Sequence, residues 1–297
     1  RTPGILLALF TLFVPSASFA QELLQWKYTP GDKFHVKVVQ RMTFVSKDPS
    51  PRPILNSEMV MEMTWQVNWL DLDTGLMTHS IDRLKMKMKV LEQETDFDSA
   101  DQANTDEDSA NYLGNIAPLI GLQYQVKMKS NGEIIEVTLP ESDRDAIKRL
   151  PSGTLLKNVF SPAGMQQFLG LSGLVLPTEK ISAGHQWDRA SKVKNPVGML
   201  NTNTNYTYTG TVDGKDSIAR IAIAKTMGFG KSDNPLGLST KIVEQRSTGE
   251  ALFNIVEGFL DSSEISQRMV MESRVGDNNF QQELNSFDSM IIERVKQ

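Results

Sequence analysis

The residues of this chain best suited to bind a metal ion are carboxylates between residues 92 and 111. Asp96, Asp98 and Asp101 would supply the hard oxygen ligands that Ca²⁺ prefers. Their spacing departs from the Asp-x-Asp-x-Asp-Gly pattern of calcium loops, and the segment contains no basic residue. The competing interpretation is a solvated, mobile acidic loop. For the protein as a whole, we expect no cofactor.

The remaining reactive residues form no recognisable catalytic motif. The chain has no cysteine, which excludes thiol catalysis, disulfides and cysteine-ligated metals. Its three histidines, His35, His79 and His185, have no metal-binding spacing, and we expect them at ordinary surface positions. Ser172 lies between glycines but not in the Gly-x-Ser-x-Gly pattern of hydrolases. We therefore name no catalytic residue.

Methionine and tryptophan alternate with polar residues in two segments, Met59–Trp69 and Leu84–Val90, which flank a polar turn. A period of two is typical of strands with one apolar and one polar face, so the pattern predicts a β-hairpin. Methionine fills irregular cores, and it also lines adaptable apolar binding surfaces. Both interpretations stay open here. The candidate ligand-binding residues of the second are Met61, Met63, Trp65, Met86 and Met88.

The polar face of the second segment is a basic row formed by Arg83, Lys85, Lys87 and Lys89. Such a row could meet an acidic polymer or a membrane surface. The interpretation we prefer is a solvated row whose charges pair with carboxylates of a neighbouring strand, Glu62 for instance.

Length and composition are those of an ordinary globular protein. The 297 residues suffice for one large domain or two smaller ones. Hydrophobic residues make up 39% and charged residues 23% of the chain, and the net charge of -5 argues against nucleic acid as a partner. After the first twenty residues, no segment is apolar and long enough to cross a bilayer as a helix.

The first twenty residues have the pattern of a signal peptide. An apolar run over residues 4–14 is followed by Pro15 and then by small residues at Ser18 and Ala20. We expect cleavage between Ala20 and Gln21, and hence export to the periplasm or the extracellular space. No cysteine follows this site, so lipidation there is excluded.

Strand-like alternation dominates both halves of the remaining chain. We divide it into an N-terminal antiparallel half, residues 21–140, which includes the acidic loop 92–111, a helical connector, 141–176, and a C-terminal antiparallel half, 177–297. The fold class we predict is mainly β with short helices. In this prediction, two related curved antiparallel sheets or half-barrels are joined by the helical connector.

Short turns punctuate both halves and suggest an internal repeat. Pro30–Phe34 and Ala183–Trp187 share a small residue, a glycine, two polar residues and an aromatic residue. Hairpin turns are predicted at Asn131-Gly132, Asp213-Gly214 and Glu257-Gly258.

Several short motifs are distributed along nearly the whole chain after the signal peptide. They are Pro30-Gly31-Asp32-Lys33-Phe34, Met61-Glu62-Met63-Thr64-Trp65, Ile81-Asp82-Arg83-Leu84-Lys85-Met86, Phe97-Asp98-Ser99, Gly184-x-x-Trp187, Tyr206-x-Tyr208-x-Gly210 and Ser262-Ser263-Glu264-x-x-Gln267-x-Met269. In these motifs the chain resembles an uncharacterised family of secreted bacterial proteins, a domain of unknown function. Members usually carry Asp where this chain has His185, so no role transfers to that residue. The resemblance implies an envelope location and a β-rich fold, and it implies no activity.

Three functions remain compatible with the sequence. The first is a non-enzymatic cell-envelope protein whose methionine- and tryptophan-lined face binds an apolar ligand or another envelope protein. The second is a structural or interaction module without a small-molecule ligand. The third is an enzyme of unrecognised type, which would require ionisable side chains to converge in space.

Overall fold

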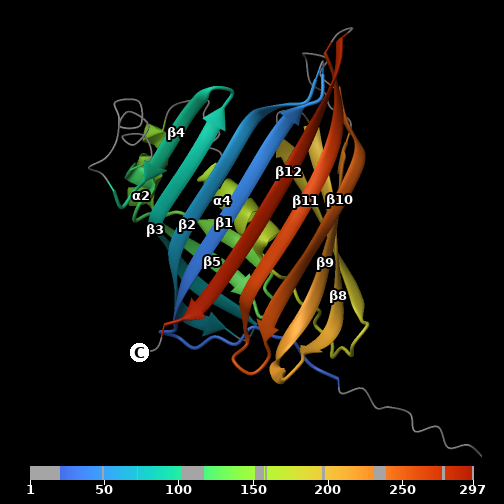
Figure 1. Cartoon of the computed structure of the whole chain (residues 1–297). Coiled ribbons are helices and arrows are strands. Elements are labelled where there is room, and N and C mark those ends of the chain that lie inside the picture. The colour runs from blue at the N-terminus through green and yellow to red at the C-terminus, as the bar shows by residue number, and fades with distance from the viewer. Residues whose placement is uncertain are drawn as a thin grey trace, which may run out of the picture.

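Twelve strands form one continuous antiparallel sheet in the computed structural model of this chain (Figure 1). The strand order is β6-β5-β3-β2-β1-β12-β11-β10-β9-β8-β7, and β4 pairs with β3 beside this path. The strands are β1 Lys33–Ser46, β2 Arg52–Asp71, β3 Thr74–Val90, β4 Gln93–Asp98, β5 Gln123–Lys129, β6 Ile134–Thr138, β7 Gln186–Asn195, β8 Gly198–Val212, β9 Lys215–Phe229, β10 Ser239–Asn254, β11 Phe259–Val275 and β12 Asn278–Arg294.

The structure describes residues 21–48, 50–71, 73–101, 117–150, 157, 159–195, 198–230, 239–275 and 278–295. The predicted signal peptide, residues 1–20, lies outside these residues. Of the two residues that flank its predicted cleavage site, Gln21 is described and Ala20 is not.

The helices are short; η1 lies between β4 and β5, and the two α-helices lie between β6 and β7. They are the 3₁₀ helix η1 Ala117–Leu119 and the α-helices α2 Glu141–Arg149 and α4 Pro162–Ser172. Helix α4 begins at Pro162, because the Ser161 hydroxyl accepts the Gly164 N–H at 3.0 Å and Pro162 suits the first turn. None of the described helices is long and apolar enough to cross a membrane.

The prediction of a mainly β fold with short helices is confirmed, whereas the prediction of two separate sheets is wrong. The first and last strands pair along nearly all of β1, from Phe34 opposite Arg294 to Ser46 opposite Gln282. An unpaired edge strand exposes a row of backbone donors and acceptors. Pairing β1 with β12 satisfies these groups in both halves and merges them into one sheet.

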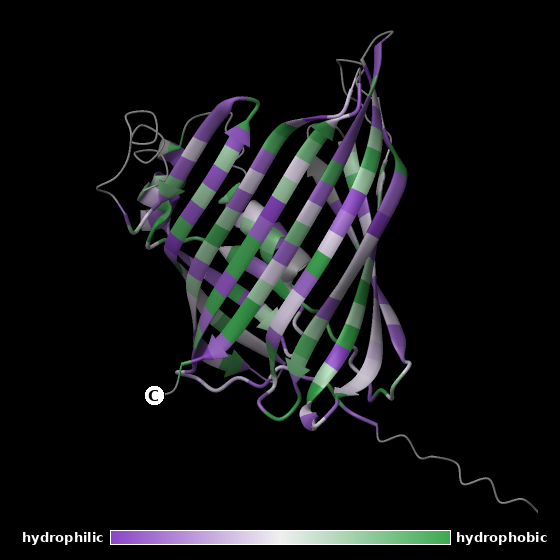
Figure 2. Ribbon diagram, viewed as in Figure 1, coloured by the Kyte–Doolittle hydropathy of each residue, from purple (hydrophilic) through white to green (hydrophobic). Residues whose placement is uncertain are grey.

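The predicted hairpin is confirmed as β2 and β3, which pair from Leu55 opposite Val90 to Asp71 opposite Thr74. Hydrophobic and hydrophilic residues alternate along the strands of the sheet (Figure 2). In β2 the side chains of Met61, Met63 and Trp65 are buried and those between them are not, as the period of two predicts.

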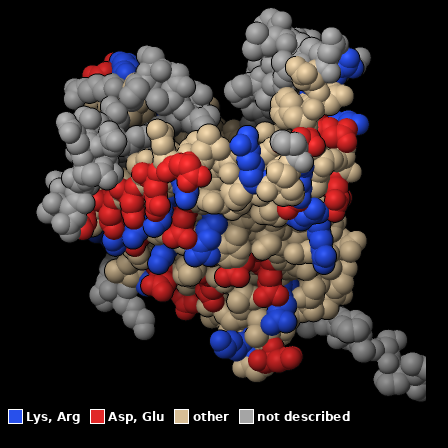
Figure 3. All heavy atoms as spheres, turned by 45° about the horizontal axis from the view of Figure 1, so that its top comes forward, with Lys and Arg blue, Asp and Glu red and all other residues tan. Residues whose placement is uncertain are grey.

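The prediction of a loop over residues 92–111 requires a correction at its start. Gln93–Asp98 forms β4, which pairs with β3 so that acidic residues lie opposite the basic row. Arg83 binds Asp98 at 2.6 Å and Lys87 binds Glu94 at 2.9 Å. Red and blue side chains therefore lie together over this end of the sheet (Figure 3). Residues 102–111, the rest of the predicted loop, lie outside the described residues.

One face of the sheet, here called the covered face, carries Phe34, Val36 and Val38 and packs against the helical segment that contains α4 (Figure 1). Met165 and Leu169 of α4 belong to the same buried cluster. Burial of each such side chain contributes about 1.5–3 kcal/mol. Most of the stability of the fold therefore arises on this face.

The segment around α4 contacts both ends of the sheet. On one side the Tyr124 hydroxyl of β5 donates to the Phe160 carbonyl at 2.7 Å. On the other side the Trp187 indole of β7 donates to the Val175 carbonyl at 2.8 Å. A connector predicted to separate two sheets thus ties the two ends of one sheet together.

The two related turns make the same backbone hydrogen bonds. Gly31 N–H donates to the Val67 carbonyl at 2.8 Å, and Gly184 N–H donates to the Tyr208 carbonyl at 2.7 Å. Both glycines have φ values near +90°, which is the left-handed region that favours glycine. The sequence similarity of these turns therefore reflects a common local structure.

Candidate functional site

Strand pairing arranges the side chains of the covered face in rows that cross the sheet. Residues directly opposite each other share a row, and alternate residues of one strand share a face. One complete row is buried, and we call it the closed row. It consists of Tyr208, Ile221, Ala251, Ser263, Met290, Val38, Met61 and Leu84.

Beyond the closed row, toward the end of β1, the same face carries apolar side chains that are no longer fully covered, together with the polar Gln40 and Ser57. On β1, the buried Val38 is followed by Met42 and Phe44, which are half-buried. The same change occurs on β2, where Met59 and Leu55 are half-buried. We call these side chains the open strip: Met42, Phe44, Leu55, Met59, Met86, Met88 and Leu284.

Three of the predicted ligand-binding residues lie in the packed core. Met61, Met63 and Trp65 are 1%, 0% and 6% exposed, so their side chains offer little surface to a ligand. Met86 and Met88 lie farther along the covered face, in the open strip, and are half-buried. The structure thus places the five predicted residues on one face and divides them between its closed and open parts.

A cluster of polar side chains interrupts the covered face beside the open strip. Lys225 of β9 and Gln267 of β11 are each 8% exposed. Ser247 of β10 lies opposite Gln267, and Gln267 lies opposite Ser286. Asp288 of β12 lies one row closer to the closed row, where its carboxylate accepts the Gln40 side-chain amide at 2.8 Å.

Burial lowers the pKa of Lys225, because transfer from water disfavours the ammonium form. The carboxylate of Asp288 opposes this shift, and the guanidinium of Arg189 adds to it. Arg189 itself donates to the Gly170 carbonyl in the last turn of α4 at 2.7 Å, a position where a cation is favourable. Among the described residues, Lys225 therefore lies near a second cation, Arg189, and near the carboxylate of Asp288.

Two atoms of this cluster have no hydrogen-bond partner within the described part of the chain. They are the side-chain amide nitrogen of Gln267 and the hydroxyl oxygen of Ser247. An unsatisfied buried polar group costs about 1–3 kcal/mol, so native structures contain few of them. Both atoms are suited to bind a further polar group.

Sequence reasoning did not identify this cluster, although one signal was present. In the strand Ile221, Ile223, Lys225, Met227, every second residue is apolar except Lys225. A charged residue in the apolar phase of a strand indicates a buried polar site. Gln267 and Asp288 give no comparable signal, because only the pairing of β11 and β12 shows which face they occupy.

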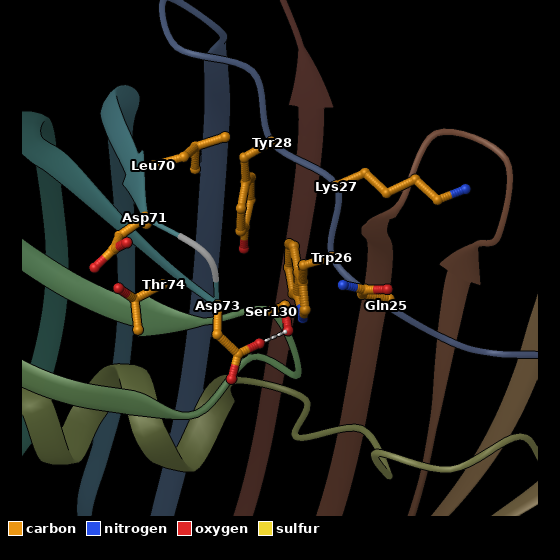
Figure 4. A pocket seen from close by; sticks show the side chains of 10 residues that line it. Gln25, Trp26, Lys27, Tyr28, Leu70, Asp71, Asp73, Thr74 and Ser130 are labelled. Atoms are coloured by element: carbon orange, nitrogen blue, oxygen red, sulfur yellow. Dashed lines mark hydrogen bonds between the residues drawn. The ribbon is translucent and has the colours of Figure 1, made fainter.

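A cleft of about 610 Å³ lies at the other end of the sheet, where β1 begins (Figure 4). Trp26 and Tyr28 line one side and stack with ring centroids 5.6 Å apart, and Asp73 accepts the Ser130 hydroxyl at 2.9 Å. Trp26 is only 6% exposed. The open strip exposes more apolar side chains on one face, and we regard it as the stronger candidate.

The predicted metal ligands do not converge among the described residues. The carboxylate of Asp98 accepts two hydrogen bonds from the Arg83 guanidinium, and Asp96 lies opposite Lys87 on the neighbouring strand. Within the described ranges, no group of three His, Asp or Glu side chains could hold a metal ion. Asp101 is described, whereas the residues that follow it are not.

The expectation that all three histidines lie at the surface is wrong for His79. Its side chain is 1% exposed and stacks on Trp65 with ring centroids 4.2 Å apart. Burial lowers the pKa of His79 to about 3. His35 and His185 are partly exposed, and Nε2 of His185 lies 3.5 Å from a Glu179 carboxylate oxygen.

Comparison with known proteins identifies a family and no function. The model described as "Family of unknown function (DUF6263)" matches residues 74–260, which confirms the resemblance to a family of unknown function. No curated protein matches the sequence.

Structural similarities to solved proteins are weak. A lipovitellin structure has a TM-score of 0.45 and 13% identity, over 90% of this chain and 25% of that chain. This chain therefore spans about a quarter of the length of that protein. An outer membrane channel from Pseudomonas putida F1 has a TM-score of 0.24 and 8% identity, over 90% of this chain and 97% of that chain. DynF from Micromonospora chersina has a TM-score of 0.22 and 8% identity, over 92% and 85% of the two chains. At these TM-scores, none of the three supports an argument about this chain.

Proposed function

This chain belongs to the family of unknown function DUF6263, and we propose that it is an exported, non-enzymatic envelope protein that binds an apolar ligand on the open strip. Export rests on the signal-peptide pattern of residues 1–20. Binding without catalysis rests on the chemistry of the strip, whose side chains offer contact area and no acid, base or nucleophile.

The observation that carries the proposal is the change in burial along a single apolar face. Val38 and Met61 of the closed row are 2% and 1% exposed, whereas Phe44 and Leu55, farther along the same two strands, are half-buried. A face that only served the core would become polar where its packing partners end. This face keeps seven large apolar side chains among a few polar ones, and four of these seven half-buried side chains are the adaptable methionines.

The expected affinity is modest. Burying the remaining exposed area of several such side chains would contribute a few kcal/mol in total. The loss of translational and rotational freedom on binding offsets part of this gain. We therefore expect a dissociation constant in the micromolar range for a simple apolar probe.

Leu55→Glu is expected to weaken binding of the fluorescent apolar probe N-phenyl-1-naphthylamine by at least about tenfold, because a carboxylate in an apolar contact must be desolvated. The measurement is a fluorescence titration of purified protein. Circular dichroism and the thermal midpoint of unfolding report whether the variant is folded.

Asn56→Glu is the matched control for this variant. Asn56 is the next residue of β2, points to the opposite face and is exposed. The same change in charge is expected to alter probe affinity there by less than about twofold. Absence of probe binding to the wild-type protein would refute the proposed function, and equal losses in both variants would place the site elsewhere.

A further inference from the structure

We propose that the cleft near the start of β1 binds a small alkylammonium ion, with its positive charge beside the carboxylate of Asp73 and its alkyl groups against Trp26 and Tyr28. We call the site formed by these three residues and Leu70 the cation cleft. It lies at the end of the sheet opposite the open strip and shares no residue with it. The two sites are therefore separate, and neither proposal depends on the other.

Hydrogen bonds between three segments hold the walls of the cation cleft in place. The backbone N–H of Trp26, in the segment before β1, donates to the Ser130 carbonyl at 2.8 Å. Ser130, which follows β5, donates its own N–H to the Asp73 carbonyl at 3.0 Å and its hydroxyl to the Asp73 carboxylate at 2.9 Å (Figure 4). The carboxylate is thus positioned before a ligand arrives, which lowers the entropic cost of binding.

The charges around the cation cleft favour a cation. Lys27 is the one basic residue among the described residues that line it, and its ammonium donates to the carbonyls of Ile255 at 2.9 Å and Val256 at 3.2 Å. This side chain extends away from Asp73 (Figure 4).

A second lysine near Asp73 is paired with another carboxylate. The pKa of Lys129 is raised mainly by its hydrogen bond to Glu133, whose carboxylate lies 2.6 Å from the ammonium, and to a smaller extent by Asp73. In the described part of the chain, no basic side chain forms an ion pair with Asp73. A bound cation would therefore meet a carboxylate that accepts a hydrogen bond only from the neutral Ser130 hydroxyl.

The aromatic wall selects a cation that carries alkyl groups. The rings of Trp26 and Tyr28 stack with centroids 5.6 Å apart, and Tyr28 is half-buried, so part of its side chain is accessible. The face of an aromatic ring is negative and attracts ammonium ions. Leu70 also lines the cleft and is 40% exposed, which adds apolar surface. Metal ions instead require several oxygen ligands, and no group of three such side chains is present within the described ranges.

Titration of the wild-type protein with choline and with 3,3-dimethyl-1-butanol tests this proposal. The two molecules have nearly the same shape, and the alcohol has a neutral carbon where choline has its charged nitrogen. The resonance of the Trp26 indole N–H in a ¹H–¹⁵N spectrum reports binding, and its absence from the spectrum of Trp26→Phe assigns it. Choline is expected to bind at least about tenfold more tightly than the alcohol.

Asp73→Asn is expected to weaken choline binding by at least about fivefold and to leave affinity for 3,3-dimethyl-1-butanol within about twofold of wild type. Asparagine keeps an oxygen that can accept the Ser130 hydroxyl, so the wall of the cleft is preserved. Asp213→Asn is the matched control, because it removes the same charge at an exposed position in the β8–β9 turn, on the other half of the sheet. It is expected to change choline affinity by less than about twofold.

Salt dependence gives a second measurement on the wild-type protein, should Asp73→Asn fail to fold. Raising the KCl concentration from about 50 mM to about 500 mM is expected to weaken choline binding at least about twofold and to leave binding of the alcohol unchanged.

Equal binding of choline and the alcohol, or no shift of the Trp26 resonance with either, would refute the cation cleft. Equal losses of choline affinity in Asp73→Asn and Asp213→Asn would refute it as well, as would choline binding that does not respond to salt. None of these results bears on the open strip, which is tested with the neutral probe N-phenyl-1-naphthylamine.

Discussion

Gly132→Ala is expected to lower the free energy of unfolding by about 3 kcal/mol. Gly132 has a φ of +88°, where a non-glycine residue costs about 1–2 kcal/mol. An added Cβ would also lie 2.3 Å from the Leu174 carbonyl oxygen and 2.6 Å from the Trp26 indole nitrogen. Such overpacking costs about 1–3 kcal/mol more, because the backbone after α4 must move.

Gly214→Ala is the matched control for Gly132→Ala. Gly214 occupies the β8–β9 hairpin turn with a φ of +74°, and an added Cβ there would have no atom within 4 Å. Only the cost of the left-handed conformation applies, so we expect a loss of about 1 kcal/mol. Urea unfolding of the two variants measures the difference. Equal losses would show that the β5–β6 turn and the segment after α4 accommodate the added methyl group at no cost.

Acidification from pH 8 to pH 5 is expected to reduce the free energy of unfolding by about 2 kcal/mol through His79 alone. The ordinary pKa of 6.5 is lowered to about 3 in the folded protein by burial. Between these values the unfolded state binds the proton and the folded state does not. Stability is therefore complete above pH 6.5 and falls by about 1.4 kcal/mol per pH unit down to about pH 3.

His79→Phe is expected to abolish this part of the acid sensitivity, because phenylalanine keeps an aromatic ring against Trp65 and cannot bind a proton. At pH 8 its stability should not fall, since neither ring nitrogen of His79 has a hydrogen-bond partner among the described residues. Urea unfolding at pH 8 and pH 5 measures both effects. His35→Gln is the control, because His35 lies on the face of β1 opposite the covered face. This variant is expected to keep the acid sensitivity of the wild-type protein. A His79→Phe variant that loses as much stability as wild type between pH 8 and pH 5 would contradict this role of His79.

Local structure was largely predictable because it depends on neighbouring residues in the chain. The alternation around Met61, Met63 and Trp65 predicted a strand with one buried face, and β2 has that face. Asn131-Gly132 predicted a hairpin turn, and β5 and β6 pair across it. Turn chemistry and a period of two require only a few adjacent residues, so no distant contact could overturn these predictions.

The segment after Val90 shows where local reasoning fails. Its acidic composition and lack of basic residues favour a solvated loop, yet Gln93–Asp98 pairs with β3. The basic row supplies the compensating charges, and that compensation depends on contacts between two strands. Composition within one segment cannot reveal charges that another segment contributes.

The sequence by itself determined the strand pattern, the turns, the mainly β fold class and the apolar face. Tertiary structure decided that β1 and β12 join the two halves in one sheet, that Met61 and Trp65 are core residues, and that Met88 lies in the open strip. It also placed Lys225 beside Gln267 and Asp288. The physical reason is that alternation fixes which face a side chain occupies, whereas strand order and the limited reach of the helical segment fix what covers it.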